Sequence, residues 1–177
     1  IPRNIKFKSY KLLTITKNYN LPTIIKDKYA LILDSKKSAE KGFGAYLSFD
    51  ENTENFNLNN VFILKDHFKY FEEGDIVKID ASGRVNSLFR KKSKHNTILL
   101  TERCNHKCIM CSQPPKEKDD SWLLQQTMDL IEIIPKDTIN LGYSGGEPTL
   151  YGDDFIKLLD KTKRYLPNTG IDVLTNG

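Results

Sequence analysis

From residue 97 to its end, the sequence alternates short apolar runs with longer amphipathic segments. The apolar runs cover residues 97–101, 138–143 and 171–174. Between them, residues 121–134 and 153–165 place apolar side chains at helical spacing. Strand and helix repeated in this order predict right-handed β–α–β units, and therefore a parallel sheet covered by helices.

Both helical segments have recognisable ends. Ser121 is a candidate N-cap of the first helix, and Pro135 is expected to end it. The second helix carries acidic residues in its first turn, which suits the positive end of the helix dipole. Its expected apolar face consists of Phe155, Ile156, Leu158 and Leu159.

Each predicted strand is followed directly by residues that could carry chemistry. Because the carboxyl ends of parallel strands share one edge of a sheet, these residues are predicted to converge in space. The three groups are Cys104, Cys108 and Cys111 after the first strand, Gly145-Gly146-Glu147-Pro148 after the second, and Thr175-Asn176-Gly177 after the third.

The cysteines form a C-x3-C-x2-C loop and are the only three in the chain. An iron–sulfur cube has four iron corners and is normally held by four thiolates. Three thiolates leave one iron open to a substrate or cofactor, and an open position is typical of a reactive site. An odd number of closely spaced thiols does not indicate a disulfide framework, so we expect a reducing, cytoplasmic setting.

Two alternative roles for the cysteines stay open. His95 or His106 could act as a fourth ligand and complete a closed zinc site. Zinc sites usually recruit paired knuckles, however, and the chain has no second cysteine pair. The thiols could also be unliganded and structural. The spacing favours the cluster over both, with His106 facing solvent.

The first 94 residues are predicted to be mostly β. Residues 75–89 read as two alternating segments around a glycine-containing turn, which indicates a hairpin. Several short strands joined by polar turns predict a small barrel-like domain or a curled sheet. Further strands are expected at 29–34, 44–49 and 61–64, a loop at 35–42, a turn-rich stretch at 52–60 and a linker at 91–94.

The fold class is therefore α/β, with a small β-rich domain at 1–94 and a parallel α/β domain at 95–177. The first domain carries 18 Lys and Arg against 11 Asp and Glu, whereas the second carries 9 against 12. The basic residues of the first domain read as a solvated surface, since no basic run with stacking aromatics supports nucleic-acid binding. No apolar stretch is long enough to span a membrane.

The cysteine loop followed by the Gly-Gly-Glu-Pro motif resembles the radical S-adenosylmethionine (SAM) superfamily, which has a partial (β/α)6 barrel. The resemblance covers residues 97–177. The sequence around the cysteines, Leu100–Asn105 and Met110–Pro115, resembles more narrowly the radical SAM maturases of the His-Xaa-Ser repeat peptide system. Those enzymes modify a small ribosomally made peptide.

The resemblance implies a role for each motif. Cys104, Cys108 and Cys111 would hold a [4Fe-4S] cluster, and SAM would bind its fourth iron. The turn Gly145–Pro148 would receive the SAM amino group, with the Glu147 carboxylate nearby. Asn176 would contact SAM or substrate. Met110 stands where the superfamily often has an aromatic residue beside the adenine, and a polarizable thioether can fill that place.

The implied reaction is reductive cleavage of SAM to methionine and a 5′-deoxyadenosyl radical, which abstracts a hydrogen atom from the peptide. The implied partners are a precursor peptide, which the first domain could dock, and an electron-donating reductase. No residue is assigned a catalytic role. The alternative function is a non-catalytic peptide-binding or zinc-binding module.

The sequence begins at Ile1 rather than methionine and stops after the third predicted strand. We therefore expect a barrel truncated after that strand. On this expectation, the 177 residues alone would bind a cluster poorly and turn over slowly.

Overall fold

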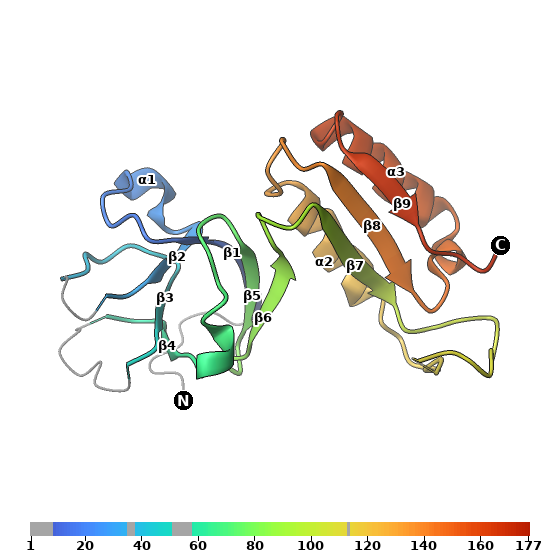
Figure 1. Cartoon of the computed structure of the whole chain (residues 1–177), viewed down its shortest axis with the longest axis horizontal. Helices are drawn as coiled ribbons and strands as arrows, with labels where there is room; N and C mark the ends of the chain where they lie inside the picture. Colours follow the sequence, from blue (N-terminus) through green and yellow to red (C-terminus); the bar gives the residue numbers. More distant parts are fainter. Residues whose placement is uncertain (1–8, 35–37, 51–57, 113) are drawn as a thin grey trace. The chain divides into compact units, whose positions relative to one another are not determined.

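The computed structural model describes residues 9–34, 38–50, 58–112 and 114–177 (Figure 1). The chain divides into two compact units, Ile1–Lys92 and Ser93–Gly177, close to the predicted boundary after residue 94. Within the described residues, no helix has the length and apolar character needed to cross a bilayer.

The first unit is built on one mixed sheet in the order β4-β3-β2-β1-β5-β6. Strands β1 to β4 pair parallel with one another, while β5 pairs antiparallel with both β1 and β6. Among the described residues β4 and β6 are edge strands, so the sheet is open and not a closed barrel. The strands are β1 (Tyr10–Thr16), β2 (Tyr29–Ile32), β3 (Ala45–Ser48), β4 (Val61–Ile63), β5 (Ile76–Asp80) and β6 (Val85–Phe89), with short helices α1 (Thr23–Lys26) and η2 (Asp66–Phe68).

The predicted hairpin is confirmed as β5–β6. Its turn is closed by Asp80, whose Oδ1 accepts the backbone N–H groups of Ser82 at 2.9 Å and Arg84 at 3.0 Å. Gly83 supplies the positive φ of 84° that the turn needs. The runs predicted at 29–34, 44–49 and 61–64 contain β2, β3 and β4, but the sequence analysis missed β1.

The second unit confirms the predicted β–α–β order. Its sheet is parallel, in the order β7-β8-β9, and one helix follows each of the first two strands (Figure 1). The elements are β7 (His95–Thr101), α2 (Trp122–Ile131), β8 (Asn140–Gly145), η3 (Pro148–Tyr151), α3 (Asp153–Tyr165) and β9 (Gly170–Val173).

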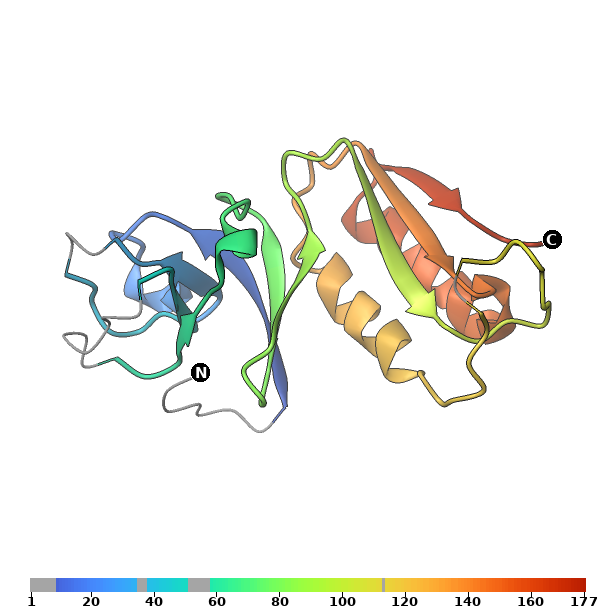
Figure 2. The same cartoon turned by 60° about the horizontal axis from the view of Figure 1, so that its bottom comes forward.

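The helices cover one face of this sheet (Figure 2). Along β7, Ile98 and Leu100 are buried while Thr97 and Leu99 are exposed, as expected for a strand with one covered face. Ile98 is in register with the fully buried Tyr143 of β8. The resulting core contains Ile98, Leu100, Leu123, Leu130, Ile131, Leu141, Tyr143, Phe155 and Leu158.

Ser121 stands at the N-cap of α2, as predicted, although its side chain makes no capping bond. Its own N–H is bound by Asp119 Oδ1 at 3.0 Å. Other local predictions were wrong. Helix α2 ends at Ile131, before Pro135. Ile156 is 55% exposed and not part of the apolar face of α3. Parts of the predicted loop at 35–42 and the turn-rich stretch at 52–60 lie outside the described residues.

Candidate functional site

The three motifs that follow the strands of the second unit meet at one edge of its sheet. The N–H of Gly146 donates to the Thr101 carbonyl at 2.8 Å. The N–H of Glu147 donates to the Arg103 carbonyl at 2.9 Å. The N–H of Asn176 donates to Glu147 Oε2 at 2.7 Å. The predicted convergence of the cysteine loop, the Gly-Gly-Glu-Pro turn and the Thr-Asn-Gly segment is therefore confirmed.

Two glycines allow the turn after β8 to approach the residues that precede Cys104. A Cβ on Gly145 would lie 2.2 Å from the Thr101 carbonyl oxygen, and one on Gly146 would lie 2.1 Å from the Arg103 carbonyl oxygen. Gly145 also has a φ of 154°. Side chains cannot be accommodated at such distances. The glycines therefore allow the two loops to pack closely, a role that the sequence analysis did not anticipate.

Glu147 and Pro148 begin the short helix η3. Pro148 occupies its first turn, where a missing N–H costs nothing. Glu147 is the N-cap, and its Oε1 accepts the N–H of Thr149 at 2.9 Å and the Thr149 hydroxyl at 2.6 Å. The same oxygen accepts the Thr175 hydroxyl at 2.9 Å. The motif is thus a capping device that also reaches the segment after β9.

The Glu147 carboxylate is fully buried and ionised. Burial acts to raise its pKa, but the hydrogen bonds donated by Asn176, Thr149 and Thr175 outweigh burial and lower the pKa to about 2. Four donors from the chain itself satisfy most of its acceptor capacity. In this structure the carboxylate joins loops of the protein.

Cys104 is the best-anchored of the three cysteines. Its side chain is partly buried, and its Sγ lies 3.4 Å from the N–H nitrogen of His106 and 3.6 Å from Asn176 Nδ2. Asn176 Nδ2 also donates to Asn105 Oδ1 at 3.0 Å. The structure therefore brings together Cys104, Glu147 and Asn176, which the sequence analysis had selected independently.

Cys108 and Cys111 lie on the exposed part of the loop. A turn links them, because the N–H of Cys111 donates to the Cys108 carbonyl at 3.1 Å. Among the residues that the structure describes, no three His, Cys, Asp or Glu side chains are close enough to hold a metal ion. The three thiols therefore have to move closer to one another before they can bind a metal ion or cluster.

The donor set nevertheless fits an iron–sulfur cluster. Three soft thiol ligands on a single loop are the donors that such clusters use, and two of them are exposed enough to reorient. His95 begins β7, so the seven-residue strand separates it from the cysteine loop by about 20 Å. This distance excludes His95 as a fourth ligand in this conformation.

The remaining predicted site residue, Met110, is 93% exposed. A cavity of about 260 Å³ lies against the cysteine loop and is lined by Glu102, Ser112, Pro114, Lys116 and Gly146. It is somewhat smaller than the roughly 300–1,000 Å³ of typical ligand pockets. Gln113, within the segment that flanks the third cysteine, lies outside the described residues.

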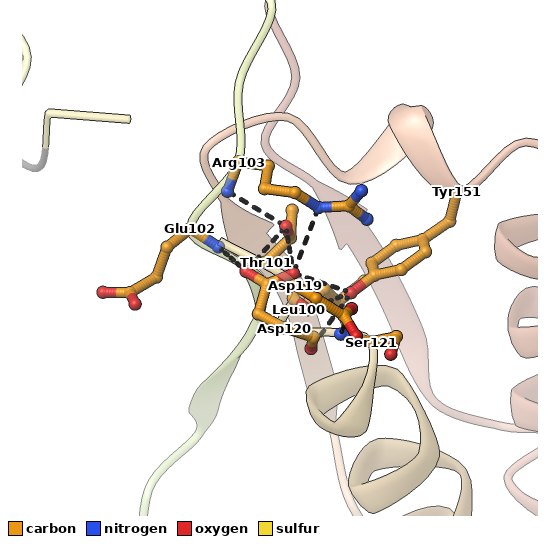
Figure 3. A network of polar contacts seen from close by, with 8 residues as sticks. All are labelled: Leu100, Thr101, Glu102, Arg103, Asp119, Asp120, Ser121 and Tyr151. Carbon is orange, nitrogen blue, oxygen red and sulfur yellow. Dashed lines mark hydrogen bonds and ion pairs between the residues drawn. The ribbon is translucent and has the colours of Figure 1, made fainter. Parts of the chain in front are cut away.

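The sequence analysis missed a polar network around Asp120 (Figure 3). Asp120 is 5% exposed and contacts Thr101, Glu102, Arg103 and Tyr151. The sequence pattern of a helix N-cap selected its neighbour Ser121, and no motif in the sequence indicates that Asp120 is buried.

A comparison with models of protein families matches residues 98–177 to the radical SAM superfamily. No curated protein and no solved structure matches the chain. Proteins of this superfamily typically use a [4Fe-4S] cluster and SAM, and the match indicates a SAM-cleaving radical enzyme. The matched residues contain the cysteine loop, the Gly-Gly-Glu-Pro turn and Asn176. Residues 98–177, a little under half of the chain, are therefore similar to the radical SAM superfamily.

Proposed function

We propose that this domain binds a [4Fe-4S] cluster and SAM in an enzyme that modifies a ribosomally made peptide of the His-Xaa-Ser repeat type. The observation that carries the proposal is the meeting of Cys104, Glu147 and Asn176 at one edge of the sheet. Three loops from three strands form a site there, beside a cavity that Gly146 lines.

Cys104, Cys108 and Cys111 hold the cluster as thiolates. When bound, the cluster supplies the electron that splits SAM into methionine and a 5′-deoxyadenosyl radical. The chain orients and shields the reactants. Asn176 contributes directly, because its Nδ2 lies 3.6 Å from Cys104 Sγ and can donate to the thiolate. Donors to ligating sulfurs tune the reduction potential of such clusters.

The turn Gly145–Pro148 receives the amino group of SAM. The Gly146 edge of the cavity supports this placement. Met110, which is exposed, would lie beside the adenine of SAM. Glu147 acts by holding the turn and Asn176 in place through partly buried hydrogen bonds.

The peptide substrate is proposed from the sequence flanking the cysteines, which resembles that of His-Xaa-Ser maturases. The first unit is then a docking domain for the precursor peptide, and a separate reductase donates electrons. The thiols, which form no disulfide, suit a reducing cytoplasmic setting.

Anaerobic reconstitution of the complete encoded protein with iron and sulfide tests the proposal. We expect about four irons per chain by the chemistry of the cluster, and dithionite-dependent release of 5′-deoxyadenosine from SAM. Single Cys→Ala substitutions at 104, 108 and 111 should abolish both. His106→Ala is the matched control, since it leaves the cluster intact but removes a ligand from a zinc site. A colourless zinc protein without SAM cleavage would reject the proposal.

The peptide is tested separately with the reconstituted enzyme. A synthetic peptide with several His-Xaa-Ser repeats should change in mass in the presence of SAM and dithionite. The same peptide with each His replaced by Ala is the control. Release of 5′-deoxyadenosine without a mass change in either peptide would leave the domain a SAM-cleaving enzyme and contradict this substrate.

A further inference from the structure

A buried carboxylate closes the loop that carries the three cysteines. Asp120 stands just before α2, and the loop begins at Glu102, just after β7. Both carboxylate oxygens of Asp120 lie 3.0 Å from Thr101 Oγ1, and Oδ2 accepts the N–H of Glu102. Asp120 therefore ties the two ends of residues 102–119 together (Figure 3).

The same carboxylate fixes the residue before the first cysteine. Arg103 Nε lies 3.2 Å from Asp120 Oδ1, and its guanidinium lies over the ring of Tyr151, 5.3 Å from the centroid. The N–H of Arg103 donates to Thr101 Oγ1 at 3.0 Å, and the Arg103 carbonyl is bound by Glu147. The main chain of Arg103 is thus held on both sides, and Cys104 follows it directly.

Tyr151 connects this network to the Gly-Gly-Glu-Pro turn, because it is the last residue of η3. Its hydroxyl donates to the Leu100 carbonyl at 3.0 Å and lies 3.4 Å from Asp120 Oδ1. One buried group therefore contacts the end of β7, the start of the cysteine loop and the helix that follows the turn.

We propose that Asp120 is a positioning residue for the cluster: it closes the neck of the cysteine loop and holds Arg103 so that Cys104 is in place before Cys108 and Cys111 close. This inference rests on the proposed function. Ordering a long loop costs conformational entropy. Asp120 already orders the start of the loop in the folded apoprotein, so less conformational entropy is lost when the cluster binds. Loss of Asp120 therefore weakens cluster retention, although all three cysteines remain.

Asp120→Asn tests the inference on the complete protein, with Asp119→Asn as the matched control. Asp119 is the exposed neighbour, and the hydrogen bond that its carboxylate accepts from the N–H of Ser121 does not involve Thr101, Glu102 or Arg103. The first readout is hydrogen exchange in the apoprotein. Asp120→Asn should raise exchange at Glu102 and Arg103 roughly ten-fold or more, as expected when hydrogen bonds to a charged group are lost. Amides of β8 should stay protected, and Asp119→Asn should match the parent at Glu102 and Arg103.

The second readout is the rate at which a chelator removes iron from the reconstituted protein. Asp120→Asn should lose iron roughly ten-fold faster than both the parent and Asp119→Asn. Tyr151→Phe keeps the ring beneath Arg103 and removes only the hydroxyl. It should lose iron faster than the parent but more slowly than Asp120→Asn.

Unchanged exchange or unchanged iron loss in Asp120→Asn would overturn the inference and leave the proposed function standing. Equal loss of protection at Glu102 and in β8 would also overturn it, since Asp120 would then serve the fold as a whole. Failure of the parent itself to bind iron would overturn both proposals.

Discussion

The carboxylate of Glu147 accepts the N–H of Asn176 at 2.7 Å and so links the turn after β8 to the segment after β9. Both residues contact the cysteine loop, Glu147 through the Arg103 carbonyl and Asn176 through Cys104. Glu147 thus links three loops that are far apart in the sequence, because its carboxylate accepts from Asn176 and its backbone N–H donates to the Arg103 carbonyl.

Glu147→Ala should destabilise the second unit by about 2 kcal/mol, because it removes partly buried hydrogen bonds that a charged carboxylate accepts from Thr149, Thr175 and Asn176. Urea unfolding, monitored by hydrogen exchange at the amides of β8, measures the change in the free energy of unfolding. Asp172→Ala is the control, since it removes an exposed hydrogen bond to Asn140 and should cost less than about 1 kcal/mol. Equal stability of Glu147→Ala and the parent would contradict the structural role.

The low pKa of Glu147 predicts an acid dependence of stability. Its pKa is about 2 in the folded chain and about 4.3 in an unfolded one. The unfolded state therefore takes up the proton first, so the stabilisation is complete above about pH 5 and is lost as the pH falls toward 2. The urea midpoint of the parent should fall more steeply over this range than that of Glu147→Gln. Parallel curves would show that the carboxylate is not selectively stabilised.

Gly146→Ala should destabilise the second unit by about 2 kcal/mol or more, because its Cβ would lie 2.1 Å from the Arg103 carbonyl oxygen. Gly170→Ala is a matched control. Its φ is not positive, and the atom nearest to the added Cβ is Asn140 Nδ2, at 3.2 Å, which is the end of a side chain, so the cost should be below about 1 kcal/mol. Thermal unfolding of both variants should give this order, and the reverse order would contradict the close approach of the loops.

A buried pair between β8 and α3 predicts unequal effects of two conservative changes. The Thr162 hydroxyl donates to the Leu158 carbonyl at 2.8 Å, so the adjacent Tyr143 hydroxyl donates to Thr162. Tyr143→Phe leaves Thr162 satisfied and should cost about 1 kcal/mol, whereas Thr162→Val strands the Tyr143 hydroxyl and should cost about 2 kcal/mol. Denaturant unfolding measures both. A larger cost for Tyr143→Phe would reverse the assigned donor direction.

Sequence periodicity predicted the second unit better than the first. Strands alternating with amphipathic helices admit few arrangements, so β7, β8, β9, α2 and α3 were all found. Among the described residues of the first unit, no helix connects β2 to β3 or β3 to β4, and the short apolar runs of this unit carry no signal of their pairing order. The prediction of a small barrel or curled sheet therefore did not specify the order in which the strands pair.

The sequence by itself determined the candidate ligand set, the order of strands and helices in the second unit, and the edge at which the motifs meet, because these depend on spacing along the chain. Only the tertiary structure decided what the motif residues do to one another. The glycines admit the Arg103 backbone, Glu147 binds Asn176, and Asp120 closes the cysteine loop. Such roles depend on burial and on contacts between residues far apart in the sequence. Neither can be derived from the local sequence.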